Sequence, residues 1–270
     1  MSRFLLILLL FCFSIYESPK NDSIHIISWN IQHFGKTKKS AELEKIANIV
    51  KDVDIIAIQE VVAGYGGAQA VAKLSDILNR KGEKWDYIVS NPTKSSKYMK
   101  ERYAFIWKTK DIKIKNRGRL VTELHDTIER EPHMVEFYTK GKRFTVVNFH
   151  SISYSKNPRS EIAALTDFII DNLETPLLLA GDFNLDGEDP VFKNFLNMGY
   201  KASVYSEKTT LKQKCYNGLY LNYSIDNIYY SNGLSKVNSG VVDFVLVCDE
   251  LKNARQLSDH LPVYLEFRIN

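Results

Sequence analysis

The chain has 270 residues, of which 44% are hydrophobic and 25% are charged, so it carries enough apolar material for one sizeable core or two small ones. This excludes a disordered tail, and 13 Gly, 7 Pro and no homopolymer tract exclude collagen-like and low-complexity classes. The formal net charge of +4 is compatible with an anionic partner but does not establish one. An ordinary globular protein remains.

The first residues have the pattern of an export signal. Arg3 precedes the unbroken apolar run 4–13, and the chain turns polar from Tyr16 onward. A membrane-spanning helix needs about 20 apolar residues, and this run is shorter. We therefore expect residues 1–20 to be an export signal, no stable membrane insertion after its removal, and a secreted or periplasmic monomer. Its loss leaves Cys215 and Cys248, whose pairing the sequence does not decide.

The rest of the chain, 22–270, reads as a single domain in which short β-type runs alternate with amphipathic stretches. Runs rich in Ile, Val, Tyr and Phe predict strands at 23–29, 55–59, 85–90, 103–107, 135–138, 143–149, 176–180, 225–230 and 262–267. Ser40 fits the N-cap of a helix that would bury Leu43, Ile46, Ala47 and Val50. Further helices are expected at 68–78, 160–173 and 190–198. This order predicts packed sheets under flanking helices.

Several predicted strands end or begin with a polar side chain that a strand-to-loop turn does not require. These are Asn30, Glu60, His150, Asp182, Asn184, Asp226, Asp259 and His260. Each has a structural interpretation as well, since Asp182 and Asn184 could form an Asx turn and His150 could be a core histidine bonded to a carbonyl. As a set they are hard oxygen ligands plus two imidazoles, a combination that favours Mg²⁺, Mn²⁺ or Ca²⁺ over zinc or copper.

Such a set can hydrolyse a phosphodiester, a reaction that needs charge neutralisation, a base for water and an acid for the leaving oxygen. The two histidines are natural proton carriers, because an imidazole titrates near ~6.5. Each needs a carboxylate to fix its tautomer. Asp226 and Glu101 are candidates, although spacing alone cannot pair them with their histidines.

The chain resembles the endonuclease/exonuclease/phosphatase superfamily, and within it most closely the secreted deoxyribonuclease I family, from about Ile24 to Phe267. The strings that carry the superfamily resemblance are Gln59-Glu60, Gly181-Asp182-Phe183-Asn184 and Ser258-Asp259-His260-Leu261-Pro262-Val263. Those that favour the deoxyribonucleases are Asn30-Ile31-Gln32-His33-Phe34-Gly35, Lys100-Glu101-Arg102-Tyr103 and Arg130-Glu131-Pro132.

This resemblance implies an α/β fold, a four-layered sandwich of two packed mixed β-sheets flanked by helices. It also implies roles for particular residues. Glu60 would hold the catalytic divalent metal with Asn30 and Asp259 close by, and Asp182 and Asn184 would contact the metal or the scissile phosphate. His260, oriented by Asp226, would be the general base, and His150, oriented by Glu101, would protonate the leaving 3′ oxygen, unless the two roles are exchanged. Arg130 would grip a substrate phosphate, and Tyr98 or Tyr103 would lie against the sugar-phosphate path.

The sequence departs from the family pattern at several positions. Val62 stands where the family has an arginine that enters the minor groove, and Tyr65 in the following glycine-rich loop could replace that contact. Gln32 and Asn227 replace basic residues. The family's bridge beside Gly-Asp-Phe-Asn is missing, because Asp186-Gly187-Glu188 holds no cysteine.

The sequence thus favours a secreted endonuclease that cuts DNA with little sequence preference, leaves 5′-phosphates, and depends on Mg²⁺, with Mn²⁺ and Ca²⁺ as further candidate ions. Lysines 36, 38, 39, 94, 97 and 100 provide local positive charge for a polyanion. The alternative is a secreted phosphodiesterase of the same fold acting on sphingomyelin or inositol phosphates. A sphingomyelinase needs an exposed apolar hairpin for membrane docking, and we expect none here. A non-catalytic binding module is disfavoured because both histidines and all the acidic positions are present.

Overall fold

The computed structural model describes residues 22–174 and 176–270, and the expected export signal lies outside them. In chain order the elements are β1 (Ile24–Phe34), α1 (Ser40–Val50), β2 (Ile55–Val62), α2 (Gly67–Asn79), β3 (Trp85–Val89), β4 (Glu101–Lys108), β5 (Lys113–Ile114), β6 (Arg119–Leu120), η1 (Thr122–Leu124), β7 (His133–Thr139), β8 (Lys142–His150), η2 (Tyr154–Lys156), α3 (Arg159–Asn172), β9 (Leu177–Asp182), η3 (Pro190–Phe192), α4 (Lys193–Asn197), β10 (Lys201–Ala202), β11 (Leu211–Tyr216), β12 (Leu219–Leu221), β13 (Asp226–Tyr230), β14 (Leu234–Val241), η4 (Cys248–Glu250), α5 (Leu251–Leu257) and β15 (Val263–Ile269).

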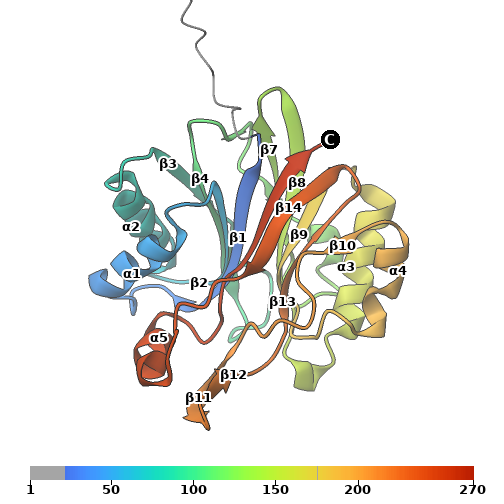
Figure 1. Cartoon of the computed structure of the whole chain (residues 1–270). Helices are drawn as coiled ribbons and strands as arrows, with labels where there is room; N and C mark the ends of the chain where they lie inside the picture. Colours follow the sequence, from blue (N-terminus) through green and yellow to red (C-terminus); the bar gives the residue numbers. More distant parts are fainter. Residues whose placement is uncertain (1–21, 175) are drawn as a thin grey trace, which may run out of the picture.

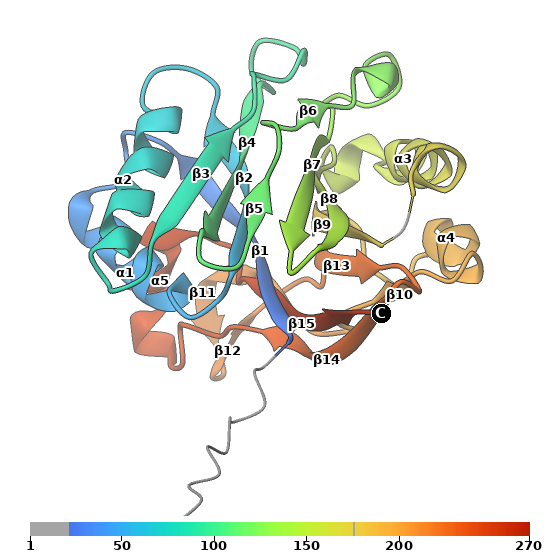
Figure 2. The ribbon, with the colours of Figure 1, turned by 90° about the horizontal axis from the view of Figure 1, so that it is seen from above.

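Two mixed sheets pack face to face, and helices cover their outer faces, so the predicted four-layered sandwich is confirmed (Figure 1). The first sheet has the strand order β14-β15-β1-β2-β4-β3, with α1 and α2 outside it. The second has the order β10-β13-β9-β8-β7-β5, with β6 paired to β7 and with α3 and α4 outside (Figure 2). None of the helices in the described residues is long and apolar enough to cross a bilayer.

Three apolar cores correspond to the three interfaces between these layers. The central core joins the inner faces of the two sheets, and its members include Ala57, Phe105 and Phe137. A second core lies between the first sheet and α1 and α2, and a third lies between the second sheet and α3 and α4. Strands such as β2 are apolar on both faces because each face is covered, which explains their unbroken runs of Ile and Val.

Each strand predicted from the sequence has a counterpart, although most extend by one to several residues beyond the expected ends. Helix α1 buries the four predicted apolar residues, but Ser40 is its first helical residue and not its N-cap. Lys39 takes the cap position, and its backbone N–H donates to Glu42 Oε2 at 2.8 Å. Strand β14, helix α5 and the two-stranded hairpin of β11 and β12 were not predicted from the sequence.

Candidate active site

Strand direction brings the predicted polar residues to one edge of the sandwich. In the first sheet β1 and β2 are parallel and β4 is antiparallel to β2, so the end of β2 at Glu60 lies near the start of β4 at Glu101. In the second sheet His150 pairs with Asp182 in the parallel register of β8 and β9, and Asp226 pairs with Asp182 across β13 and β9. The carboxylates and imidazoles therefore meet at this edge although they are far apart in the sequence.

His150 is buried between a carboxylate and a guanidinium group. Its Nδ1 lies 2.9 Å from Glu101 Oε2, which also accepts a hydrogen bond of 3.0 Å from Arg130 Nε. Arg130 Nη2 lies 3.4 Å from the other ring nitrogen, Nε2. Burial disfavours the imidazolium, and so does the charge of Arg130, but the charge and hydrogen bond of Glu101 together with the charge of Asp182 prevail and raise the pKa of His150. Glu101 thus fixes the ring so that Nε2 faces Asp182 Oδ2, 3.5 Å away.

The two tyrosines expected along the substrate path have very different surroundings. Tyr103 is fully buried, and its hydroxyl accepts from His150 N at 3.3 Å and donates to the Arg130 carbonyl at 3.5 Å. Its position is behind His150, so the expected contact of Tyr103 with the sugar-phosphate path is corrected: a side chain without exposed surface supports the site from inside. Tyr98 is 91% exposed in the loop before β4 and stays a candidate for substrate contact.

The second imidazole, His260, is held by Asp226. Its Nδ1 lies 2.9 Å from Asp226 Oδ2, and Trp29 Nε1 donates to its backbone carbonyl at 2.8 Å. Burial again disfavours the imidazolium, yet Asp226 and then Asp182 prevail and raise the pKa of His260 to about 10. Thr209, which the sequence analysis did not select, donates from Oγ1 to Asp226 Oδ2 at 2.6 Å. No motif marks this threonine, since its role depends on the loop that carries it past β13.

Asp182 is the point at which the two histidines converge. Its Oδ2 lies 3.5 Å from His150 Nε2 and 3.7 Å from His260 Nε2, and it accepts a hydrogen bond of 3.0 Å from Asn30 Nδ2. Its Oδ1 accepts from the backbone N–H of Asn184 at 2.9 Å, so the Asx-type turn considered from the sequence is present as well. Two ring nitrogens, one from each histidine, therefore face the same carboxylate oxygen.

The backbone has positive φ at several of these positions, among them Asn184 with φ 50°. Gly181 has φ +157°, and a Cβ there would lie 1.8 Å from the Phe149 carbonyl oxygen, so only glycine lets β9 approach β8 immediately before Asp182. Glu60 has φ 59°, a left-handed conformation that costs a non-glycine residue free energy. Such conformations concentrate at functional sites, where the surrounding structure enforces them.

Asn30 and Glu60 together have the donor chemistry of a divalent-metal site. Asn30 Nδ2 donates to Glu60 Oε1 at 3.1 Å, which leaves the buried Asn30 Oδ1 without a hydrogen-bond partner in the described part of the chain. A buried, unpaired amide oxygen beside a carboxylate suits a hard cation. A second group, Asp182, Asp226 and His260, has ligand atoms within 4.8 Å of one another. His260 Nδ1 and Asp226 already bind each other there, so Glu60 and Asn30 fit a resident ion better.

The positions that depart from the family pattern have defined partners. Gln32 Nε2 donates to Asp259 Oδ2 at 3.0 Å, and Arg255 Nη2 lies 3.7 Å from the same oxygen. Asn227 is buried, and its Oδ1 accepts from Ser203 Oγ at 3.1 Å, so it supports the second sheet from within. Tyr65, by contrast, is 81% exposed, as a surface contact requires.

Cys215 and Cys248 form a disulfide, with their Cα atoms 5.7 Å apart. This answers the question that the sequence left open. The bridge joins β11 to η4 and does not involve Asp186-Gly187-Glu188, where the family's own bridge is missing.

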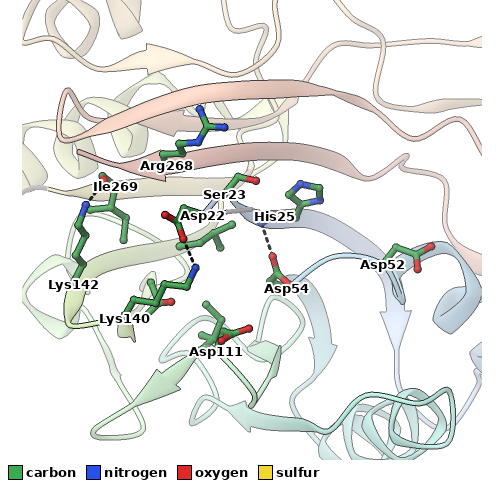
Figure 3. Close-up of a pocket in the computed structure, with 13 residues that line it drawn as sticks. Asp22, Ser23, His25, Asp52, Asp54, Asp111, Lys140, Lys142, Arg268 and Ile269 are labelled. Carbon is green, nitrogen blue, oxygen red and sulfur yellow. Dashed lines mark hydrogen bonds and ion pairs between the residues drawn. The ribbon is translucent and has the colours of Figure 1, made fainter. Parts of the chain in front are cut away.

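A hollow of about 690 Å³ lies at the opposite end of the sandwich, among residues such as Ile24, Asp54 and Ile269 (Figure 3). Its polar groups bind one another: His25 N donates to Asp54 Oδ2 at 2.9 Å, and Lys142 Nζ donates to the Ile269 carbonyl at 2.6 Å. It holds neither of the two histidine–carboxylate pairs. The converging groups at the other edge, and not this hollow, therefore define the candidate active site.

The fold and the converging groups define a hydrolytic enzyme of the α/β sandwich class. Residues 27–260 match the model of the Endonuclease/Exonuclease/phosphatase family, and the chain belongs to that family. The superfamily expected from the sequence is thereby confirmed.

The similar curated proteins are deoxyribonucleases. A deoxyribonuclease from Thioalkalivibrio sp. (strain K90mix) is 28% identical over 92% of this chain and 72% of its own length. Mouse deoxyribonuclease-1 is 33% identical over 60% of each chain, and mouse deoxyribonuclease gamma is 26% identical over 97% of this chain and 88% of its own. The alignment with deoxyribonuclease-1 thus spans about three fifths of that protein.

Solved structures extend the likeness in fold. A family member from Bacteroides thetaiotaomicron superposes with a TM-score of 0.64 at 18% identity, covering 92% of this chain and 98% of that one. A mannosyl-6-phosphatase from the same species gives a TM-score of 0.63 at 18% identity, covering 90% and 99%. At such identities the likeness establishes the sandwich and leaves the substrate to the site itself.

Proposed function

We propose that the chain is an exported, divalent-metal-dependent endonuclease that hydrolyses DNA phosphodiester bonds to 5′-phosphate products with little sequence preference. The observation that carries the proposal is the convergence of His150 Nε2 and His260 Nε2 on one carboxylate oxygen, each with Nδ1 held by its own carboxylate. The deoxyribonuclease relatives support DNA as the substrate.

The two imidazoles carry the protons of the reaction. Nε2 of His260 accepts a proton from water as the water oxygen bonds to phosphorus, and Asp226 stabilises the imidazolium that forms. The bond between phosphorus and the 3′ oxygen breaks, and His150 Nε2 donates its proton to that oxygen. One strand end then carries a 5′-phosphate and the other a 3′-hydroxyl.

We propose that Arg130 and Asn184 bind the substrate phosphate beside these imidazoles, as the resemblance implies. A divalent ion held by Glu60 and Asn30, with Asp259 nearby, would supply positive charge for the developing negative charge on the phosphate. We propose Mg²⁺ as this ion, with Mn²⁺ as a substitute, because the oxygen donors suit both. Ca²⁺ remains a further candidate.

Plasmid nicking tests the proposal. The purified mature chain, His150→Ala and His260→Ala are incubated with supercoiled plasmid and Mg²⁺, with or without EDTA. His25→Ala, at the opposite end of the sandwich, is the matched histidine control. We expect nicking that EDTA abolishes, that each site variant lowers by at least ~10²-fold, and that the control preserves.

Sphingomyelin and an inositol phosphate are assayed in parallel, because a mannosyl-6-phosphatase shares this fold. Turnover of either compound by a chain that leaves plasmid intact would replace the nuclease proposal with the phosphodiesterase alternative.

A further inference from the structure

The hairpin of β11 and β12 leaves the sandwich beside His260 and projects from the catalytic end of the molecule (Figure 1). Thr210 forms an isolated β-bridge with His260, and Leu211 N donates to the Asp259 carbonyl at 2.8 Å. The first residue of the hairpin is therefore hydrogen-bonded to the segment that carries the general base. None of the catalytic groups described above lies on this hairpin.

The charged residues of this hairpin segment are all positive. Between Lys208 and Ile225 the chain holds three lysines, 208, 212 and 214, and neither Asp nor Glu. Lys214 is exposed, and Tyr216 at the tip is 72% exposed. Lysines interleaved with an exposed aromatic ring suit a polynucleotide, whose phosphates attract the ammonium groups while sugars and bases pack on the ring.

The hairpin is held rigidly even though it projects. The disulfide of Cys215 ties it to η4, and Arg255 Nη1 donates to the carbonyls of Leu211 and Lys212 at 2.8 and 3.3 Å. Tyr220 donates its hydroxyl hydrogen to Asp243. A surface already fixed in position loses little conformational freedom on binding, so its contacts contribute more fully to affinity.

We propose that the hairpin of β11 and β12 is a nucleic-acid-binding arm, on which Lys212 and Lys214 contact phosphates beyond the candidate active site and Tyr216 packs on a sugar or base. This inference rests on the proposed nuclease function and extends its substrate footprint. The six residues of β11 span about 20 Å at ~3.3 Å each, the length of roughly six phosphates of one strand. The arm therefore reaches substrate that the catalytic groups cannot.

A lipid surface is the other partner that this end of the molecule could suit, because Leu219, Leu246 and Val247 are exposed. Only Leu219 of these three residues lies on the hairpin of β11 and β12, and Leu246 and Val247 precede η4. We favour nucleic acid for two reasons. The hairpin segment itself carries lysines and no acidic residue, although Asp243 and η4 lie beside it, and the hairpin is hydrogen-bonded to the segment that carries His260.

The test compares a long DNA duplex with a dinucleotide that is too short to reach the hairpin. The double variant Lys212→Gln with Lys214→Gln is assayed with Mg²⁺ over a range of salt concentrations, and Tyr216→Ala is assayed separately. The matched control, Lys193→Gln with Lys201→Gln, removes the same charge from exposed positions on α4 and β10. Thermal unfolding and thiol titration check that each variant is folded with its disulfide intact.

For the lysine variant we expect KM on the duplex to rise about 10-fold near physiological salt, and the slope of log KM against log salt to fall by about 2, as two lost phosphate contacts require. Tyr216→Ala should raise the same KM about 5-fold or more. Cleavage of the dinucleotide stays at the wild-type rate in all variants, and the control pair keeps the wild-type KM on the duplex.

Three results would overturn the arm while leaving the nuclease proposal intact. They are an unchanged KM on the duplex in the hairpin variants, an equal loss of cleavage on the duplex and the dinucleotide, and an equal rise of KM in the control pair. If the wild-type protein sediments with phosphatidylserine vesicles, the hairpin variants do not, and KM on the duplex is unchanged, the hairpin is a lipid-docking surface instead. Wild-type protein that cuts neither DNA refutes the proposed function, and the arm with it.

Discussion

Replacing Glu101 by Gln separates the catalytic role of this carboxylate from its structural one. Glu101 is 7% exposed and accepts from both His150 Nδ1 and Arg130 Nε, at 2.9 and 3.0 Å. Although burial by itself favours the neutral acid, His150 and then Arg130 outweigh burial and lower the pKa of Glu101. In Glu101→Gln, Arg130 keeps a hydrogen-bond acceptor and loses its counter-charge inside the protein.

Removing one partner of a buried ion pair costs about 3–5 kcal/mol, and the remaining amide oxygen brings the expected loss to the lower end of that range. A loss of roughly 3 kcal/mol lowers Tm by about 6–12 °C in a protein of this size. Plasmid nicking should fall by about 10²- to 10⁴-fold, because the imidazole loses both its orientation and its charge partner.

The double variant Glu101→Gln with Arg130→Met provides the control. Removing the stranded guanidinium should recover most of the lost Tm and none of the activity. Circular dichroism on heating measures the first quantity, and the initial nicking rate measures the second. If Glu101→Gln unfolds within about 1 °C of the wild type, the ion pair does not stabilise the fold as described. Nicking at the wild-type rate would refute the role of His150 as the acid.

Three further predictions concern other parts of the molecule. Thr209→Val removes the 2.6 Å hydrogen bond to Asp226 and should lower kcat by about 10-fold with KM unchanged, whereas Thr209→Ser should restore it; an unchanged kcat in both contradicts the positioning role. Because Asp226 and Asp182 raise the pKa of His260 to about 10, its free base is scarce at neutral pH, so the nicking rate should climb from roughly pH 6 to pH 9; a flat profile argues against His260 as base. Burial lowers the pKa of His133 to about 4, so the folded protein favours the neutral imidazole. The free energy of unfolding should therefore fall by roughly 3 kcal/mol as the pH drops from about 6.5 toward 4. Denaturant unfolding of His133→Gln should show a flatter pH dependence in that window, and curves parallel to the wild type would refute the assignment.

The sequence predicted the sandwich and its catalytic edge better than it predicted the individual contacts. Runs such as Ile55-Ile56-Ala57-Ile58 mark covered strands, and the polar residues that follow them mark the strand ends. Spacing could not pair Glu101 with His150, because the contact depends on how β4 of one sheet faces β8 of the other. That pairing followed from the family resemblance, and the structure supplies its geometry.

The hairpin of β11 and β12 carried a signal that the sequence analysis passed over. Asn217-Gly218 is a favoured two-residue hairpin turn, and both residues have positive φ, 50° and 77°. The flanking Lys-Gln-Lys segment lacks the apolar alternation of a half-buried strand, so the sequence predicted no strands on either side of the turn. The burial of Tyr103 could not be read from sequence either, because a tyrosine in a strand suits a surface as well as a core.

Each imidazole belongs to one sheet and its carboxylate to the other: His150 on β8 meets Glu101 on β4, and His260 before β15 meets Asp226 on β13. A slip of one sheet over the other by a single residue, about 3.3 Å, would separate both couples at once while every strand ladder stayed whole. The turnover rate therefore depends on the alignment of the two sheets. If packing in the central core between the sheets loosens, the protein should keep its far-ultraviolet circular dichroism spectrum but lose its hydrolytic activity.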